Sequence, residues 1–420
     1  MFNTISCHVI NNVNRKDRYN NIKKNFSSKE QFQVTIHTPI SNATASVSLW
    51  LTIKKIITTI NPKNAYFILV EDDHEFCTNY SFELLKKSIE AANNLKADIL
   101  CGGVSWFKTG VQISNELFWI EKFSGLQFTI IFKRFYTTIL ESHFADYDHA
   151  DYKISDLTNK KFVIHPYISF QKDFGYSDVT VRNNLSRRVE KLFAESSKRL
   201  ELLKTIKRYY TKLELVAGNL DEAEAANILI PLYSIVEKAS INYELFSNEI
   251  NFDQTVFQIS KDDINQKWET LCQCIKQAQI NSESFIVVSF DQIPLSPLFR
   301  KSIFINNIIS ANSFSCELLL GNIARFNHAV PVTSSLFWVD SFSYSSFIVL
   351  FSSLFERVTT TRPLEEENIY TYLSYLTSQK LALYPFIADI ETIDIGKPKF
   401  QEKGDQLSIY KQVYQTYVKL

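Results

Sequence analysis

The sequence predicts an α/β protein built from two tandem copies of one fold, which a long helix joins. Three observations support this prediction. Apolar runs of strand length alternate with amphipathic segments, the chain matches itself about 220 residues later, and the apolar run from Ala65 to Val70 ends in Glu71-Asp72-Asp73. Strands that alternate with helices are typical of a sheet covered by helices on both faces. We therefore expect a mostly parallel, three-layer sheet in each copy.

The spacing of apolar residues predicts the order of elements in the first copy. Segments rich in β-branched and aromatic residues read as strands, and segments with apolar residues every three or four positions read as helices. Strands are expected at 7–11, 32–37, 65–70, 98–102, 117–120 and 162–169, and helices at 16–26, 48–59, 81–93 and 125–140. A charged stretch, 184–215, also has helical spacing, and Gly218-Asn219 is its stop signal.

The internal repeat assigns the rest of the chain. The segment 64–73 lies over 282–291, and the preceding helical segments carry Trp50 and Trp268, which are 218 residues apart. Further matches follow in the same order, Leu117 to Glu121 over Leu336 to Asp340 among them. A fixed period over this length indicates a duplication. We expect a first domain at 1–181, a helical linker at 182–222 and a degenerate second domain of the same fold at 223–420.

Comparison of the two copies separates framework residues from site residues. The apolar positions agree, whereas Glu71-Asp72-Asp73 aligns with Ser289-Phe290-Asp291, Asn11 with Pro231 and Arg18 with Lys238. A phenylalanine within a carboxylate cluster removes charge and adds bulk. We therefore expect the polar residues to serve chemistry in the first copy and the second copy to be inactive.

Composition excludes several classes of protein. Lys plus Arg equals Asp plus Glu at 45 each, so no net field favours nucleic acid. The six cysteines are scattered and lack zinc spacing, and neither a P-loop nor a G-x-G-x-x-G sequence occurs. The N-terminal residues lack the pattern of a signal peptide, and no apolar run is long enough to span a bilayer. These features predict a cytoplasmic protein, with the inner face of the membrane as an alternative location.

The acidic triplet is the strongest functional signal. In α/β sheets, ligands bind beyond the carboxyl ends of the strands, where Glu71, Asp72 and Asp73 are expected. Three adjacent carboxylates repel one another, and oxygen ligands suit Mg²⁺ or Mn²⁺. A solvated loop at the strand end is the alternative reading.

With these residues placed, the first copy resembles the family-25 glycosyltransferases, which include lipooligosaccharide galactosyltransferases. The family opens with a Val-Ile-Asn strand followed by an Asp-Arg pair, as in Val9-Ile10-Asn11 and Asp17-Arg18. A degenerate helix motif at 46–50, the Glu-Asp-Asp strand end, and then Pro166, Gln171 and Ser177-Asp178 follow in family order. The resemblance covers about residues 7–180, and the Gly-Cys and His of the helix motif are missing.

The resemblance implies a GT-A, Rossmann-like fold and a role for each matching residue. Asp73 is expected to coordinate Mn²⁺ or Mg²⁺, and Asp72 to share the ion or contact a ribose. Glu71 would orient this pair. Asn11 and Arg18 would meet the base or the phosphates of the donor, although a surface ion pair is an equal alternative for Arg18. Gln171 and Asp178 would line the donor or acceptor pocket.

An inverting transferase needs a general base for the acceptor hydroxyl. The loop from His143 to Asp151 offers Asp148 as the first candidate, followed by Asp146 and Asp151. Acidic residues also occur at the aligned positions Glu365 and Glu367, so a solvated helix entry remains the alternative. His165 is expected to be a satisfied strand histidine.

These features together predict a metal-dependent glycosyltransferase. It would move a sugar from a nucleotide sugar, expected to be a UDP-hexose, with inversion to a glycan or glycolipid such as lipopolysaccharide or capsule. Peripheral membrane association and partner glycosyltransferases are further candidates. The alternative is a non-catalytic glycan-binding or scaffold protein. A nucleotidyltransferase is disfavoured because the chain lacks a glycine-rich N-terminal phosphate loop.

Overall fold

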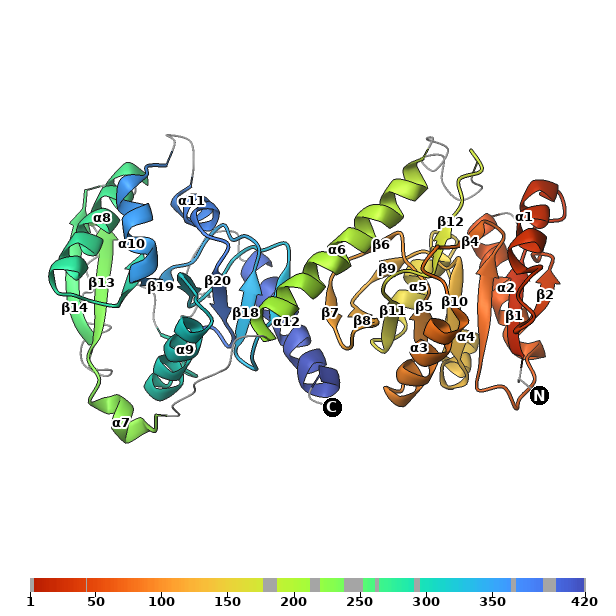
Figure 1. Ribbon diagram of the computed structural model, residues 1–420, viewed down its shortest axis with the longest axis horizontal. Helices are drawn as coiled ribbons and strands as arrows, with labels where there is room; N and C mark the ends of the chain where they lie inside the picture. Colours follow the sequence, from red (N-terminus) through yellow and green to blue (C-terminus); the bar gives the residue numbers. More distant parts are fainter. Residues whose placement is uncertain are drawn as a thin grey trace. The chain divides into compact units, whose positions relative to one another are not determined.

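The chain forms two compact units. The computed structural model describes residues 4–42, 44–176, 187–211, 220–237, 252–260, 264–290, 295–363, 368–387 and 398–418. The first unit comprises Met1–Thr205 with Tyr417–Leu420, and the second comprises Ile206–Thr416 (Figure 1). The predicted limits of a linker at 182–222 and a second domain at 223–420 stay predictions.

The first unit is built on an eight-stranded mixed sheet with the order β2-β1-β3-β10-β5-β11-β8-β7. Its strands are β1 (Ile5–Ile10), β2 (Phe32–His37), β3 (Tyr66–Glu71), β5 (Ile99–Cys101), β7 (Gly110–Gln112), β8 (Leu117–Ile120), β10 (Phe128–Phe132) and β11 (Lys161–Ile164). Strands β2, β1 and β3 are parallel, and β10 runs antiparallel to both of its neighbours. Two small sheets pair β4 (His74–Phe76) with β12 (Ser169–Gln171) and β6 (Trp106–Phe107) with β9 (Phe123–Ser124).

Helices connect these strands. They are α1 (Lys16–Phe26), α2 (Ala45–Thr59), α3 (Phe82–Asn94), α4 (Tyr136–Glu141) and α5 (Ala150–Asp156), with a 3₁₀ turn at Lys133–Phe135. Helix α6 (Arg188–Thr211) follows and runs past Thr205 into the sequence of the second unit. Thr44 and Ser81 cap α2 and α3, because each side chain accepts from the backbone N–H three residues later. The core between helices and sheet is aromatic and aliphatic, with Trp50, Phe67 and Phe128 fully buried.

The eight-stranded sheet of the first unit recurs in the second unit. Its sheet has the order β14-β13-β15-β19-β16-β20-β18-β17, in which each strand holds the place of its counterpart in the first unit. The strands are β13 (Ile230–Glu237), β14 (Phe252–Ile259), β15 (Phe285–Phe290), β16 (Leu318–Leu320), β17 (Ala329–Pro331), β18 (Leu336–Val339), β19 (Phe347–Phe351) and β20 (Lys380–Leu383). The helices are α7 (Glu222–Ala226), α8 (Ile264–Ile280), α9 (Lys301–Ser313), α10 (Ser352–Thr360), α11 (Ile369–Leu376) and α12 (Pro398–Val413), followed by a π-helical turn at Tyr414–Val418. The prediction of an α/β fold in two tandem copies with a long intervening helix is confirmed.

Sheet register corrects the residue-by-residue alignment of the two units. Val70 lies opposite Phe128 in the first unit, and Ser289 lies opposite Phe347 in the second, so the strands match at an offset of 219 residues. Phe290 therefore replaces Glu71, where the sequence alignment paired Glu71 with Ser289. The β1 and β13 registers place Ile235 at the position of Ile10, so Val236 follows where Asn11 follows Ile10. The predicted pairing of Asn11 with Pro231 was wrong, and Lys238 and Asp291 lie outside the described residues.

Two predicted features of the first sheet were also wrong. The segment 125–140 is not one helix, because Phe128–Phe132 is a fully buried strand and helix begins only at Tyr136. When every residue of a short run is apolar, hydrophobic periodicity cannot distinguish a buried strand from a buried helix. The sheet is also mixed, since β10, β8 and β7 run antiparallel to their neighbours.

No helix in the described part of the chain is both long enough and apolar enough to cross a membrane.

Candidate functional site

Polar residues gather where β1 and β3 end side by side. Ile10 lies opposite Glu71 in the parallel ladder, so Asn11 and Asp72 follow at the same edge of the sheet. The Asn11 Nδ2 donates to Asp72 Oδ2 over 3.1 Å, and both residues are buried. This is the carboxyl edge at which α/β sheets bind ligands.

Arg18 joins the two aspartates. Its Nη1 donates to Asp72 Oδ1 at 2.8 Å and to Asp73 Oδ2 at 2.9 Å, and its side chain is only 6% exposed. Arg15, at the start of α1, adds a longer ion pair to Asp72 at 3.3 Å. The alternative of a surface ion pair for Arg18 was wrong, because its guanidinium is part of a largely buried network.

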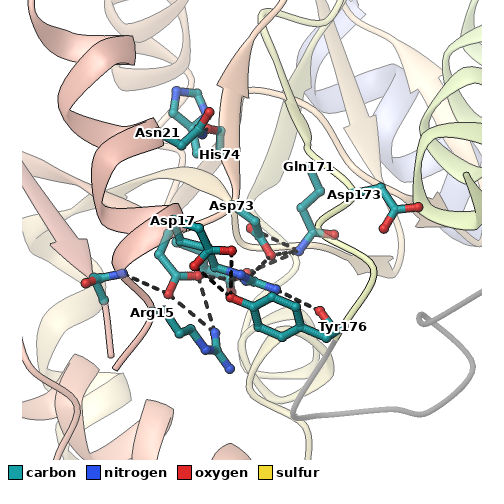
Figure 2. Close-up of polar contacts among 12 residues, drawn as sticks. Arg15, Asp17, Asn21, Asp73, His74, Gln171, Asp173 and Tyr176 are labelled. Carbon is teal, nitrogen blue, oxygen red and sulfur yellow. Dashed lines mark hydrogen bonds and ion pairs between the residues drawn. The ribbon is translucent and has the colours of Figure 1, made fainter. Parts of the chain in front are cut away.

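Gln171 reaches the cluster from a distant part of the sequence. Strand β12 pairs with β4 so that Gln171 lies opposite His74, directly after Asp73. The Gln171 Nε2 lies 3.3 Å from Glu71 Oε2 and from both carboxylate oxygens of Asp73. Figure 2 shows Arg15, Asp73, Gln171 and Tyr176 converging from separate elements. The predicted grouping of Asn11, Arg18, Gln171 and the acidic triplet is what the structure brings together.

An aromatic segment after β12 covers Arg18. The rings of Phe174 and Tyr176 lie 5.0 and 4.7 Å from the guanidinium carbon, and the Tyr176 carbonyl accepts from Arg18 Nη2 at 2.8 Å. The Tyr176 hydroxyl contacts Asp17 at 3.1 Å. Asp178, two residues further on, lies outside the described residues. Sequence reasoning missed Arg15 and Tyr176, because no motif marks a loop residue whose partner is distant in the sequence.

Burial and mutual repulsion shift the titration of the acidic residues. Burial, together with the charges of Asp73, Asp151 and Asp72, raises the pKa of Glu71 well above its ordinary value. Burial also raises the pKa of Asp73 to about 6, although Arg18 opposes the shift. The carboxylates Asp73 and Asp72 hold the pKa of Arg18 above its ordinary value against the effect of burial. The cluster is therefore a charged network in which arginine balances carboxylate.

The donor set suits a divalent cation only in part. Among the described residues, no three His, Cys, Asp or Glu side chains are arranged to hold a metal ion. Asp72 and Asp73 offer carboxylate oxygens, but both carboxylates are paired with Arg18. Mg²⁺ is commonly held by one or two carboxylates while substrate phosphates complete its shell. Asp72 and Asp73 fit such a shared site if Arg18 gives up part of its pairing.

The three predicted base candidates differ in their surroundings. Asp148 is tied into its own loop, where its Oδ2 accepts from Ala145 N at 3.0 Å and Lys153 Nζ at 3.1 Å. These two donors lower the pKa of Asp148. Asp146 is exposed. Asp151 instead accepts from the Ser124 hydroxyl at 2.6 Å and from the backbone N–H of Gly125 at 3.1 Å.

Asp151 belongs to the same end of the sheet as Glu71. The backbone N–H of Glu71 donates to the Gln127 carbonyl, two residues after the glycine that binds Asp151. The charge of Asp151 also raises the pKa of Glu71. Of the three candidates, Asp151 is therefore the one that the structure links to the acidic cluster.

In the second unit aromatic rings occupy the corresponding positions. At the offset of 219 residues, Phe290 replaces Glu71 and Tyr370 replaces Asp151, and these two rings lie 5.5 Å apart, edge to face. Tyr344 replaces Gly125, and its ring lies 4.8 Å from that of Tyr370. The second unit thus has an aromatic cluster where the first has the carboxylates of Glu71 and Asp151.

His165 is buried beside Phe118 and Tyr167, and burial lowers its pKa. It packs within the core directly after β11 (Lys161–Ile164), but its buried Nδ1 has no hydrogen-bond partner among the described residues, so the histidine is satisfied only in part. Its polar neighbours are Ser197 and Glu201 of α6, which lie away from the acidic triplet in the sequence.

The solved structures described here are distant likenesses of this chain. No protein family model and no curated protein matches the chain. A197 from STIV shares 12% identity over 40% of this chain and 85% of its own, with a TM-score of 0.29. The 4-diphosphocytidyl-2C-methyl-D-erythritolsynthase from Anaerococcus prevotii shares 13% over 46% and 78%, with a TM-score of 0.24. Mannose-1-phosphate geranyltransferase from Thermus thermophilus shares 8% over 73% and 98%, with a TM-score of 0.27. Likenesses of this size carry no argument about function.

Proposed function

We propose that the first unit is a glycosyltransferase that uses a nucleotide sugar and delivers the sugar to a glycan or glycolipid hydroxyl. The observation that carries this proposal is the network of Arg18, Asp72 and Asp73 at the carboxyl ends of β1 and β3. It combines cations for a diphosphate with carboxylates for a divalent ion, at the edge where α/β sheets bind ligands. The replacement of the adjoining Glu71 by Phe290 in the second unit supports a chemical role.

The leaving group explains the mixture of charges. When the bond between the sugar C1 and the diphosphate breaks, negative charge develops on the departing phosphate oxygen. On this proposal Arg15 and Arg18 would stabilise this charge. Asp72 and Asp73 would hold Mn²⁺ or Mg²⁺, which supplies further charge stabilisation when bound. Asn11 and Gln171 keep the carboxylates oriented through their hydrogen bonds.

We propose Asp151 as the general base, ahead of Asp148 and Asp146. In an inverting displacement the acceptor oxygen attacks C1, its proton passes to a carboxylate, and the nucleoside diphosphate leaves with the bonding electrons. Asp151 is held by Ser124 and Gly125 at the end of the sheet where the acidic cluster lies, whereas Asp148 is engaged by Lys153. We also propose a UDP-hexose as the donor and lipopolysaccharide or capsule as the acceptor.

The second unit, on this proposal, is a non-catalytic copy. It keeps the sheet order of the first unit and replaces Glu71 and Asp151 with the packed rings of Phe290 and Tyr370. Binding of a glycan or of a partner transferase is the role left to it.

A thermal-shift panel tests the proposal. The intact protein is heated with UDP-, GDP-, CMP- and ADP-sugars, each with and without Mn²⁺. A ligand that binds the native state raises its apparent stability by RT ln(1 + [L]/Kd), about 2.7 kcal/mol at a hundred times Kd. We expect one nucleotide class to stabilise the protein, and the effect to disappear in Asp73→Asn. Absence of stabilisation by every nucleotide sugar would count against a transferase and favour the scaffold alternative.

A further inference from the structure

Two exposed aromatic side chains of the first unit form a pair beside Asp151. Trp106 is 39% exposed and Tyr152 is 44% exposed, and their ring centroids lie 6.4 Å apart at 76°. The other four tryptophans of the chain, Trp50, Trp119, Trp268 and Trp338, are buried. Scattered exposed apolar residues are ordinary, but adjoining aromatic rings next to polar groups are typical of ligand sites.

The local structure holds this pair in place. Trp106 lies directly opposite Ser124 in the β6–β9 ladder, and the Ser124 hydroxyl donates to Asp151, the residue before Tyr152. Phe107 is fully buried, and the guanidinium of Arg199 lies 4.2 Å from its ring and donates to its carbonyl at 2.9 Å. The indole therefore projects from a braced two-stranded sheet, which limits the entropy lost when a ligand binds.

The second unit shows that the fold does not require these aromatic residues. At the offset of 219 residues Phe326 replaces Phe107 and is also buried, yet exposed Arg325 replaces Trp106. Ser374 replaces Ser155 and keeps its hydrogen bond. The Ser155 hydroxyl accepts from the Phe123 backbone N–H over 3.2 Å, and the Ser374 hydroxyl accepts from the Phe342 backbone N–H over 3.1 Å.

The partner of the indole changes as well, because Thr371 replaces Tyr152. The framework is retained while the exposed rings are not. The pair therefore serves something other than folding.

The chemistry of the surroundings selects the ligand. The C–H groups on one face of a pyranose stack on flat aromatic rings, while its hydroxyls donate to neighbouring carboxylates. Asp151 is next to Tyr152 in α5, and the exposed Asp146 lies in the segment just before this helix. A phosphate or another anion would be repelled by these carboxylates. A neutral sugar ring suits both the aromatic faces and the acceptors.

We propose that Trp106 and Tyr152 form a platform for a pyranose ring of the acceptor glycan, which stacks on the face of one ring and packs against the other, because the two rings stand at 76°. This inference rests on the proposed function in one respect, since the bound sugar is the acceptor only if the first unit is a transferase. Asp151 would then lie between the platform and the acidic cluster, beside the hydroxyl that is to be deprotonated. The platform sets which acceptor binds and leaves donor binding unchanged.

Sugar binding without nucleotide or metal tests the platform independently of the donor site. The intact protein is titrated with methyl glycosides of galactose, glucose and N-acetylglucosamine, and with lactose. Binding is followed by saturation-transfer NMR and by acrylamide quenching of tryptophan, to which exposed Trp106 contributes most. We expect at least one sugar to bind and to protect the indole from quenching.

Matched variants decide the assignment. Trp106→Arg and Tyr152→Thr copy residues that the second unit carries on the same framework, so both variants should fold. Each should weaken sugar binding about tenfold. Tyr375→Ala, which removes a tyrosine that is 73% exposed in the second unit, is the control and should have no effect. Absence of binding by every sugar, or binding that Trp106→Arg and Tyr152→Thr leave unchanged, would overturn the platform. Loss of nucleotide binding alone would instead count only against the proposed function.

Discussion

At the scale of single residues, Arg18 sets the electrostatic balance of the site. The adjacent carboxylates of buried Asp72 and part-buried Asp73 repel each other, and one guanidinium donates to both within 2.9 Å. Two aromatic rings and a backbone carbonyl complete its surroundings. Arginine suits this place because its planar group keeps its charge and donates in several directions.

Replacement of Arg18 by Gln should therefore affect both stability and binding. Removing one partner of a buried ion pair typically costs about 3–5 kcal/mol, because the other charge stays buried without compensation. We expect a loss of about 3 kcal/mol in urea denaturation and a loss of nucleotide affinity. Arg18→Lys, which keeps the charge but not the planar fork, should be intermediate. A free energy of unfolding equal to that of the wild type in Arg18→Gln would show that the ion pairs of Arg18 do not stabilise the fold.

Asp151 gives a second prediction at this scale. General-base catalysis is worth about 10²–10⁴ in rate, so Asp151→Asn should lower turnover by that factor with little change in nucleotide affinity. Asp148→Asn is the matched control, because Asp148 is tied to Lys153 and Ala145. Turnover that depends on Asp148 and is indifferent to Asp151 would restore the order predicted from sequence.

At the scale of elements, the sequence located the framework of the site better than its partners. Strand β2 and helix α1 have the predicted bounds, and β3 delivers the acidic triplet as expected. Their apolar spacing is local information. The pairing of β4 with β12, which brings Gln171 to Asp73, depends on register between distant segments. Strand β10 was mistaken for helix because Phe128–Phe132 is buried on every side.

The first two strands also predict a response to pH. His8 of β1 stacks on His37 of β2, with 2.8 Å between Nδ1 and Nε2. Burial, and secondarily the charge of His37, lowers the pKa of His8 from 6.5 to about 4. The unfolded chain therefore binds this proton more readily, and the stability contributed by neutral His8 is lost as the pH falls from about 6.5 to about 4.

The measurement is urea denaturation of the wild type and His8→Gln at pH 7 and pH 4.5. One pKa unit corresponds to ~1.4 kcal/mol, so we expect the wild type to lose about 2 kcal/mol more than the variant between these pH values. Equal losses in the two proteins would show that His8 titrates in the folded state as it does in the unfolded chain.

At the scale of the whole molecule, duplication supplies an internal comparison. The repeat was evident from the sequence, but its alignment was wrong by one residue at the acidic triplet, because only strand pairing fixes register. The corrected register strengthens the functional contrast, since Asn11 corresponds to Val236 and Glu71 to Phe290. Asp178 and Asp291 lie outside the described residues, so their predicted roles stay predictions.

The aromatic cluster of the second unit should contribute to stability and not to nucleotide binding. Phe290 is fully buried against Tyr370, and truncation of a buried phenylalanine typically costs about 3–5 kcal/mol. We expect Phe290→Ala to lower the free energy of unfolding of the second unit by about that amount, measured by urea denaturation. Nucleotide affinity should remain that of the wild type. A selective loss of nucleotide binding in a folded Phe290→Ala protein would indicate a working second site.

The most direct test of the account is the stoichiometry of nucleotide binding. Calorimetric titration of the intact chain with UDP in the presence of Mn²⁺ counts the sites, and Asp73→Asn identifies them. We predict one site per chain, absent in Asp73→Asn, because Arg18 joins Asp72 and Asp73 in the first unit while Phe290 packs on Tyr370 at the matching edge of the second. Two sites per chain, or a single site that Asp73→Asn leaves intact, would contradict the assignment of the donor site to the first unit.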